Sequence, residues 1–412
     1  MKIIDLERKR ILGMKNICIV TLVLIFILLF LIYIILSDYK ENNKQSLLQV
    51  YENIKEDRKS TKTDLLTIDK VRDIKDKYKK VYKSKKLTDD NGNERKDVLN
   101  SELKEDKYIF RTIVANYSPI SEYDPSHILD ISNQQTNDFY KIRLDKIEQL
   151  IEDESRSNNL EVPPKEKTRI LEDVSKMQKP LKYGYAEGYE VAGSIIGPFT
   201  KIIIIIVGII IAPLFSEDKQ TKMNEIILST KFGKNKLTFY RILTGLLATT
   251  IIYLTGVTIF SIITFSIFGI QGGNLHIQGG AGYWFSPYNI TYLQQFIINI
   301  VIGYIACILM AFITMFITTF AKKVTHGVIF TIIFTILMVV MELQKIHYLN
   351  YYFLNFLPWN LINYFNMYKT YYSYNLFGVQ IDKIIFQPVV ALIIILVAFV
   401  GILCRKKKTR YL

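Results

Sequence analysis

Long apolar runs without a charge alternate with short polar segments along most of this chain. An α-helix rises 1.5 Å per residue, so about 20 apolar residues cross the roughly 30 Å hydrocarbon core of a bilayer. Residues 242–321 contain no charge at all, and the glycine-rich residues 271–282 divide this stretch into two helices. The pattern therefore predicts six transmembrane helices, at residues 17–37, 191–215, 242–268, 291–321, 324–341 and 384–404.

The polar segment between the first two predicted helices, residues 38–190, has a helical period. Apolar side chains recur there every three or four residues, Pro163-Pro164 is typical of a helix start, and no stretch alternates like a strand. The recurring positions are Leu65, Ile68, Val71, Ile74, Tyr78 and Val81, then Phe139, Ile142, Ile147, Leu150 and Ile151. The predicted fold class is an all-α membrane protein with six transmembrane helices and a helical extracytoplasmic domain inserted between helices 1 and 2. Residues 191–412 then form a core of five spans.

The distribution of charge predicts how these helices are oriented. Of the 52 basic and 38 acidic residues in the chain, residues 38–190 hold 30 and 31. The short segments that lie on one side of the predicted helices carry 18 Lys and Arg residues, whereas the loops on the other side carry three. Because Lys and Arg concentrate in cytoplasmic loops, both termini are predicted to be cytoplasmic. The basic flanks suit anionic membrane lipids, so nucleic acid is not an expected partner.

The first apolar run also has the basic flank of a secretory signal. It is too long for one, and no small-residue cleavage site follows, so we interpret it as a membrane anchor. Cys18, Cys307 and Cys404 all lie in predicted helices, which leaves the external domain without a disulfide. With a composition rich in Ile, Lys and Asn, this indicates the plasma (inner) membrane of a bacterial cell.

No motif for catalysis is found on this chain. Gly233-Lys234 lacks the upstream glycine of a phosphate-binding loop, and neither a hydrolase nucleophile nor metal-ligand spacing is present. We therefore expect no enzyme, no cofactor and no metal site here. Lys201 is the one ionisable residue inside a predicted helix, and we interpret it as extending toward the membrane surface rather than as a substrate site. Likewise, the charge run from Lys75 to Lys86 is interpreted as a solvated helix face in preference to a ligand-binding face.

The longest internal cytoplasmic loop, residues 216–233, predicts a short amphipathic helix. Ser216 is a suitable N-cap, Met223, Ile226 and Ile227 fall on one face, and Gly233 can end the helix. Such a helix either lies in the lipid headgroup layer or docks a soluble partner. The residues alone leave both interpretations open.

At this loop the chain resembles ABC-type exporter permeases, in the branch similar to sodium, peptide and drug exporters. The resemblance rests on Ala212–Glu217, Asn224–Thr230, Gly233 and Lys236, together with the six helices. It implies a cytoplasmic amphipathic connecting helix at residues 1–16, two permease halves that are identical or different, and a separate ATPase that binds ATP and Mg and docks under a coupling helix at residues 216–233. The implied ATPase-docking residues are Glu217, Asp218, Lys222, Met223, Glu225, Ile226, Ile227, Ser229 and Gly233.

An outer aromatic segment, residues 348–377, precedes the last predicted helix. From Tyr348 to Phe377 the chain has 13 aromatic residues, and Lys369 is the one charge. Trp and Tyr favour the membrane interface, so a broken or re-entrant segment at the outer leaflet is the preferred interpretation. The alternative is an outer gate, for which Pro358 and Trp359 are the candidate residues.

These features together predict the permease subunit of an ATP-driven exporter. Its cargo would be a peptide, a lipid-like compound, a drug or an ion. The alternative is a non-transporting sensor or scaffold whose extracytoplasmic domain binds a ligand. Six helices are more than a sensor needs and no cytoplasmic signalling domain is predicted, so the transporter is preferred.

Overall fold

Six long apolar helices make up the main body of the protein in a computed structural model. The structure describes residues 9, 11, 13–40, 45–83, 103, 106–120, 124–158, 162–221, 236–343, 347–369, 371 and 373–408. The six helices are α2 (Met14–Asp38), α10 (Glu187–Ile211), α13 (Lys236–Phe268), α14 (Tyr292–Thr318), α15 (Val324–Leu343) and α18 (Lys383–Lys408). Each is long and apolar enough to cross a membrane, which confirms the predicted helical fold with six spans.

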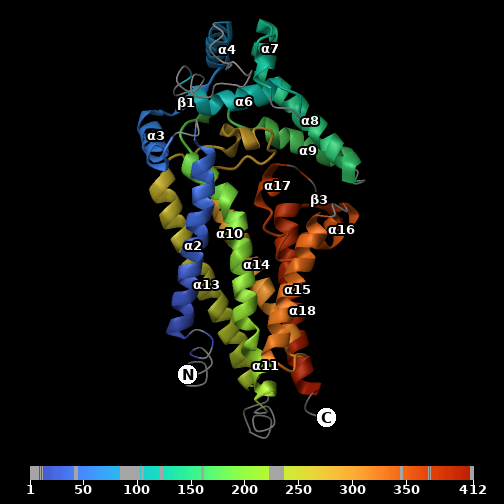
Figure 1. Cartoon of the computed structure of the whole chain (residues 1–412). Coiled ribbons are helices and arrows are strands. Elements are labelled where there is room, and N and C mark those ends of the chain that lie inside the picture. The colour runs from blue at the N-terminus through green and yellow to red at the C-terminus, as the bar shows by residue number, and fades with distance from the viewer. Residues whose placement is uncertain are drawn as a thin grey trace.

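The helices stand side by side as an elongated bundle (Figure 1). Helix α2 begins and α18 ends at the same end of the bundle, which we call the terminal end. The helices of residues 47–175 gather at the opposite end, which we call the domain end (Figure 1). This segment, together with the short strands that open and close it, is the inserted domain.

Two of the six helices form the centre of the bundle. In the apolar windows of α10 and α14, 61% and 56% of the residues are buried inside the protein, against 17% in α2 and 22% in α15 and α18. Small residues allow close helix contacts in a membrane protein. A Cβ atom added at Gly208 of α10 would lie 2.5 Å from the Cγ2 atom of Thr331 and 2.9 Å from the Cε atom of Met310. The outer helices present their exposed apolar faces to the surroundings.

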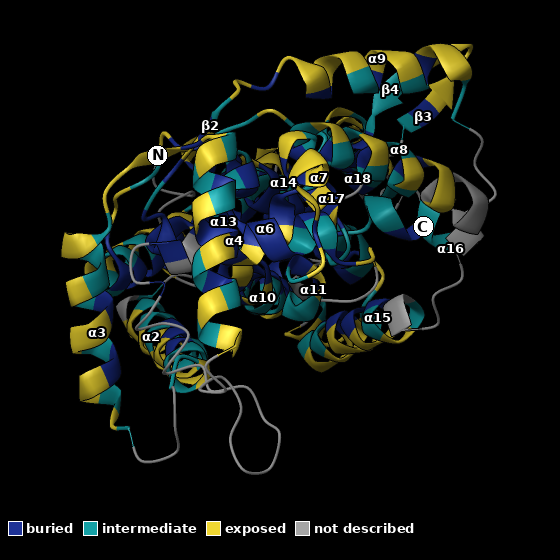
Figure 2. Cartoon of the chain, turned by 90° about the horizontal axis from the view of Figure 1, so that it is seen from above, coloured by how far each residue is buried: buried dark blue, intermediate teal, exposed yellow. Residues whose placement is uncertain are grey.

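The inserted domain is mainly helical, and its helices follow the apolar periodicity of the sequence. Its elements are α3 (Leu47–Ser60), β1 (Asp64–Leu66), α4 (Ile68–Lys83), α6 (Lys107–Tyr117), η2 (Pro125–Ile128), α7 (Asn133–Asn137), α8 (Phe139–Asn158), α9 (Pro164–Ser175) and β2 (Leu181–Tyr183). Pro164 occupies the first turn of α9, as predicted, because its missing N–H is one that a helix start leaves unpaired anyway. Seen from above, α6 lies over the bundle and is mostly buried, whereas α3 and α9 lie at the periphery with exposed faces (Figure 2).

The prediction that residues 38–190 contain no strand is wrong at two short places. β1 and β2 pair antiparallel, with Leu65 opposite Lys182, so the start and the end of the inserted domain are joined. Tyr140 fixes this pair, since its hydroxyl donates to the Leu66 carbonyl at 2.6 Å and accepts from the Leu181 N–H at 2.9 Å. Three residues per strand are too few to produce a recognisable alternation.

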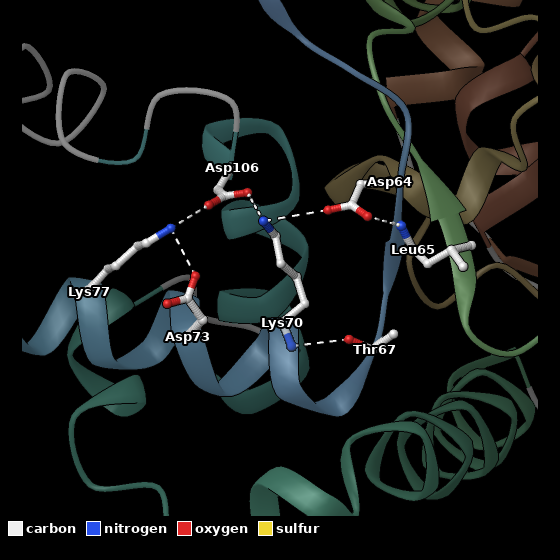
Figure 3. Close-up of polar contacts among 7 residues, drawn as sticks. All are labelled: Asp64, Leu65, Thr67, Lys70, Asp73, Lys77 and Asp106. Atoms are coloured by element: carbon white, nitrogen blue, oxygen red, sulfur yellow. Dashed lines mark hydrogen bonds and ion pairs between the residues drawn. The ribbon is translucent and has the colours of Figure 1, made fainter.

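The charge run on α4 is partly structural. Asp106, at the start of α6, forms ion pairs with Lys70 at 2.8 Å and with Lys77 at 3.1 Å. Lys77 also forms an ion pair with Asp73 (Figure 3). Lys75 is 3% exposed, and its ammonium donates to the Thr136 hydroxyl of α7 at 3.1 Å. The interpretation of the run from Lys75 to Lys86 as a solvated face is therefore wrong at its start, because Lys75 joins α4 to α7 and Lys77 joins α4 to α6.

The chain between α15 and α18 forms short elements at the domain end. They are α16 (His347–Tyr352), η5 (Leu354–Phe356), α17 (Tyr364–Lys369), β3 (Ser373–Leu376) and β4 (Val379–Asp382). β3 and β4 form a hairpin whose two turn residues, Phe377 and Gly378, have φ angles of 51° and 88°. Glycine adopts this left-handed conformation freely, whereas a residue with a Cβ atom loses about 1–2 kcal/mol.

Candidate functional site

At the terminal end, α10 continues through a bend into α11 (Pro213–Gln220). Ser216, predicted as an N-cap, lies inside α11 instead, and its hydroxyl donates to the Ala212 carbonyl at 2.8 Å. The helix starts earlier because Pro213 is suited to the first turn. The ammonium of Lys219 donates to the carbonyl oxygens of Thr319 and Ala321, where α14 ends. Lys219 thus connects α11 to the turn between α14 and α15. The helix dipole stabilises a positive charge such as this ammonium at the C-terminus of α14.

Most of the predicted docking residues lie beyond this helix. Glu217 is described and half-buried in α11, and Asp218 also belongs to α11. The others fall outside the described residues, as do most of the residues in the predicted connecting helix at residues 1–16. These others are Lys222, Met223, Glu225, Ile226, Ile227, Ser229 and Gly233. The docking role of all nine residues stays a prediction, and α11 shows where the segment leaves the bundle.

At the domain end, the outer aromatic segment enters the bundle between α10 and α14. The hydroxyl of Tyr364 donates to the Asn299 backbone carbonyl at 2.7 Å, and that of Tyr368 donates to the Asn299 side-chain oxygen at 2.8 Å. Asn299 lies seven residues into α14, which is about 10 Å below its start at 1.5 Å per residue. We call it the re-entrant segment, because it enters and leaves the bundle at the domain end, and these hydrogen bonds hold it there.

Glycines on both helices make room for this segment. A Cβ atom added at Gly197 of α10 would lie 3.3 Å from the Ile362 carbonyl oxygen, and one added at Gly303 of α14 would lie 2.7 Å from the Tyr364 hydroxyl. The second distance is shorter than any contact a real Cβ makes. A larger residue at Gly303 would thus clash with the segment, and one at Gly197 would require the backbone at Ile362 to shift by a few tenths of an ångström.

Lys201 meets the same segment. Its ammonium lies over the ring of Trp359, 4.6 Å from the centroid, in a cation–π contact. Pro358 is buried and Trp359 is half-buried, both within the turn that follows η5. The prediction that Lys201 extends toward the membrane surface stays a prediction. The structure adds that its ammonium packs against the candidate gate residue.

Two polar atoms near this turn have no hydrogen-bond partner in the part of the chain that the structure describes. They are the side-chain nitrogen of Asn299, which is 1% exposed, and the side-chain oxygen of Asn360. Unpaired polar groups are costly away from water, and at membrane depth they often mark a functional site. The re-entrant segment and the helices around it therefore combine a cation, aromatic rings and unpaired amide atoms.

In the described part of the chain, Trp284 and Tyr371 attach the inserted domain to loops of the bundle. The first is Trp284, in the loop between α13 and α14, which is fully buried among the apolar side chains of the domain. Its indole N–H donates to the Asn116 side-chain oxygen at 2.8 Å. Arg143 of α8 donates to the carbonyl oxygens of Trp284 at 2.8 Å and Ser286 at 3.1 Å, with its guanidinium over the indole ring. Burial lowers the pKa of Arg143 to about 10, so it remains charged at neutral pH.

The second attachment is Tyr371, just before the hairpin. It packs in a smaller apolar cluster between α8 and α9, with Ile147 and Ile170. Its hydroxyl donates to Glu166, and Arg169 donates both to that hydroxyl at 3.1 Å and to the Glu166 carboxylate. Burial alone raises the pKa of Glu166, but the hydrogen bonds from Arg169 and Tyr371 outweigh it and hold that pKa below its usual value.

Sequence reasoning missed a carboxylate pair at the start of α10. Glu187 and Glu190 form its first turn, with Glu187 7% exposed, and Tyr292 of α14 donates to Glu190 at 2.6 Å. The predicted helix began only at Val191 because charged residues were excluded from it. The sequence did contain a signal for this pair. Glu187 and Glu190 are three residues apart and directly precede the apolar run, and this spacing puts both carboxylates on one face of a helix. The described residues contain no group of three or more metal-ligating side chains.

Comparison with known proteins gives one match, and it covers nearly the whole chain. Residues 15–405 match the family described as ABC-2 family transporter protein. No curated protein and no solved structure matches the chain. The family implies a transport subunit, typically without its own ATP-binding motif, and a partnering ATPase subunit. The chain thus belongs to the ABC-2 transporter family and is a multi-pass membrane permease subunit of an ABC transporter.

Proposed function

We propose that this permease subunit is one half of a bacterial exporter, with the terminal end in the cytoplasm and the inserted domain outside. A separate ATPase binds ATP and Mg and docks on the coupling helix of residues 216–233. Its closure moves α11 and, through Lys219, the turn between α14 and α15. The concentration of Lys and Arg in the terminal-end segments supports this orientation.

One observation carries the proposal for the exit path. The re-entrant segment fills the space between the two central helices at the domain end, and its Trp359 ring covers the Lys201 ammonium. Pro358 and Trp359 are then the outer gate, which opens when α10 and α14 separate. A path lined by aromatic rings, a cation and amide groups suits an amphipathic cargo such as a peptide, a lipid-like compound or a drug.

The docking step is tested by co-purification. The chain is expressed with the candidate ATPase from its own locus, and binding and ATP hydrolysis are measured in detergent. Changing Met223, Ile226 and Ile227 together to Asp should abolish both, because charges replace the apolar face of the helix. A matched triple variant, Thr221→Asp, Asn224→Asp and Lys231→Asp, should retain both. If neither the wild type nor the matched variant binds any ATPase, the exporter lacks its energy source and a sensor or scaffold becomes the better account.

The gate is tested in vesicles that contain the complete transporter. Trp359→Ala removes a cation–π contact of about 0.5–2 kcal/mol, which favours the open state by about 2- to 30-fold. Leak of a fluorescent amphiphile without ATP should rise accordingly. Tyr352→Ala removes an exposed aromatic ring from the same segment and should leave the leak unchanged. An equal leak in both variants would reject Trp359 as the gate.

A further inference from the structure

The hairpin of β3 and β4 has an exposed apolar tip. Phe377 is 99% exposed, and its neighbours Val379 and Leu376 are 63% and 43% exposed. No charged residue occurs from Ser373 to Ile381. A two-residue hairpin turn with left-handed φ angles at both positions favours Asn-Gly, so Phe377 is a poor choice for the backbone. Its large apolar side chain therefore requires an explanation other than the turn itself.

The base of the hairpin is rigidly fixed to the bundle. Tyr374 is 4% exposed and stacks on Tyr351 at 4.5 Å and on Phe386 of α18 at 4.6 Å. Its hydroxyl accepts from the Gln387 side chain at 3.1 Å, and the Asn375 side chain accepts from the Gly378 N–H at 2.9 Å. The tip is thus held in a fixed position.

That position is at the membrane boundary. α18 follows the hairpin directly, and its span Lys383–Arg405 has 23 residues, a length of about 34 Å for a hydrocarbon core of roughly 30 Å. Lys383 therefore lies at the leaflet of the domain end. A four-residue strand reaches about 13 Å from there. Figures 1 and 2 show the hairpin at the side of the bundle, and its strands contact α18.

We propose that residues 376–379 insert into the leaflet at the domain end, with the Phe377 ring at the boundary between headgroups and acyl chains. The exposed apolar surface of α18 continues directly below, at Ile385 and Val389, which are 63% and 46% exposed. An uncharged tip with an aromatic ring is typical of this boundary. Lipid is favoured over a second copy of the chain because the apolar surface is continuous with a membrane-spanning helix.

The test measures the depth of residue 377 by fluorescence. Phe377→Trp is placed in lipid nanodiscs with acyl chains brominated near the headgroup or with unbrominated chains. The wild type, which keeps Trp284 and Trp359, supplies the background that is subtracted. The matched control is Gln134→Trp, at an exposed position of α7, far from the bundle (Figure 1). Val379→Trp repeats the measurement from the other strand.

Insertion predicts that bromine quenches the added emission of Phe377→Trp roughly two-fold or more, while aqueous iodide has little effect. Gln134→Trp should behave in the opposite way. Quenching of Phe377→Trp by iodide but not by bromine would overturn the proposal and leave the tip in water. Emission that neither quencher reduces would also overturn it, and would indicate that a protein covers the tip. If Phe377→Trp fails to fold, the same outcomes apply to Val379→Trp.

Discussion

Trp284 and Tyr371, from two different permease loops, enter the inserted domain and are held in different ways. Trp284, from the loop between α13 and α14, lies in the main apolar cluster of the domain, and Tyr371, from the loop before α18, lies in a smaller cluster under α9. Trp284 is fully buried, and its partners Asn116 and Arg143 are at most 1% exposed. The hydroxyl of Tyr371 depends on an ion pair in which the Arg169 side chain is 55% exposed.

This difference indicates that the attachment at Trp284 is the stronger one and that the attachment at Tyr371 is easier to separate. Separating Trp284 from its partners would leave several buried polar groups without hydrogen bonds, which is costly. Separating Tyr371 exposes groups that water can solvate, and an ion pair exposed on one side contributes little. We infer that the domain stays fixed on the loop of Trp284 while the re-entrant segment, which leads to Tyr371, moves during transport.

The largest effect is expected for Trp284→Ala. Removing a buried Trp costs about 3–5 kcal/mol, because the apolar contacts are lost and a cavity remains. The midpoint of thermal unfolding, followed by circular dichroism in detergent, should fall by roughly 3–6 °C for a chain of 412 residues. Trp284→Phe keeps an aromatic ring in the cluster but loses the hydrogen bond to Asn116. Its unfolding midpoint should therefore lie between those of the wild type and Trp284→Ala. A midpoint for Trp284→Ala equal to that of the wild type would end the claim that this attachment is the stronger.

Arg143→Lys is expected to have the next largest effect. Its guanidinium donates to two carbonyl oxygens in fixed directions, and the single ammonium of Lys cannot reproduce this geometry. One buried carbonyl oxygen then stays unpaired, at a cost of about 1–3 kcal/mol. The same unfolding measurement checks this value. Arg72→Lys, on the exposed face of α4, is the control and should change the midpoint little, since Arg72 bonds to exposed partners.

The sequence predicted the spans better than the attachments. A bilayer requires a minimum length of apolar helix, so the long apolar runs were sufficient to predict all six helices, although one of them contains Lys201. The start of α10 was predicted too late, because Glu187 is buried beside Tyr292 rather than solvated. Membrane length sets a lower bound on a helix, and it does not limit how far the helix continues into a folded domain.

Contacts between distant residues account for what the sequence could not predict. Trp284 bonds to a residue 168 positions away, and Tyr371 bonds to one 205 positions away. The burial of Lys75 depends on Thr136, which is 61 positions away. The spacing of apolar residues along a segment does not show which distant residues that segment will contact. Lys201 and Trp359 were each selected from the sequence, but for separate reasons, and only the fold brings the ammonium and the ring together.

A smaller effect is expected from the titration of Lys146, which lies beside the Trp284 attachment. Its ammonium donates to the carbonyl oxygens of Ser118 and Ala115 and lies over the Phe285 ring. Burial lowers its pKa to about 8, so above that pH the folded protein binds fewer protons than the unfolded chain. Stability should therefore rise by about 1–2 kcal/mol from pH 8 to pH 10.5, after allowance for solvent screening. Lys146→Met should remove this part of the pH dependence, and an identical slope in the variant would contradict the assignment.

The smallest effect is expected at Tyr371, where pH should matter only in acid. The pKa of Glu166 is held below its usual value, so its contribution is fully present above about pH 4.5 and is lost as pH falls through the lower value in the folded protein. Tyr371→Phe removes a hydrogen bond of about 0.5–1.5 kcal/mol.

Spin labels on α9 and on the hairpin should report one distance from pH 5 to pH 8 and a wider distribution of distances in stronger acid. In Tyr371→Phe the distribution should be wider at every pH. Widening between pH 5 and pH 8 in the wild type would show that another group controls this contact. If the distribution around Trp284 widened under the same conditions, the two attachments would be equivalent and the distinction between a fixed and a separable one would be lost.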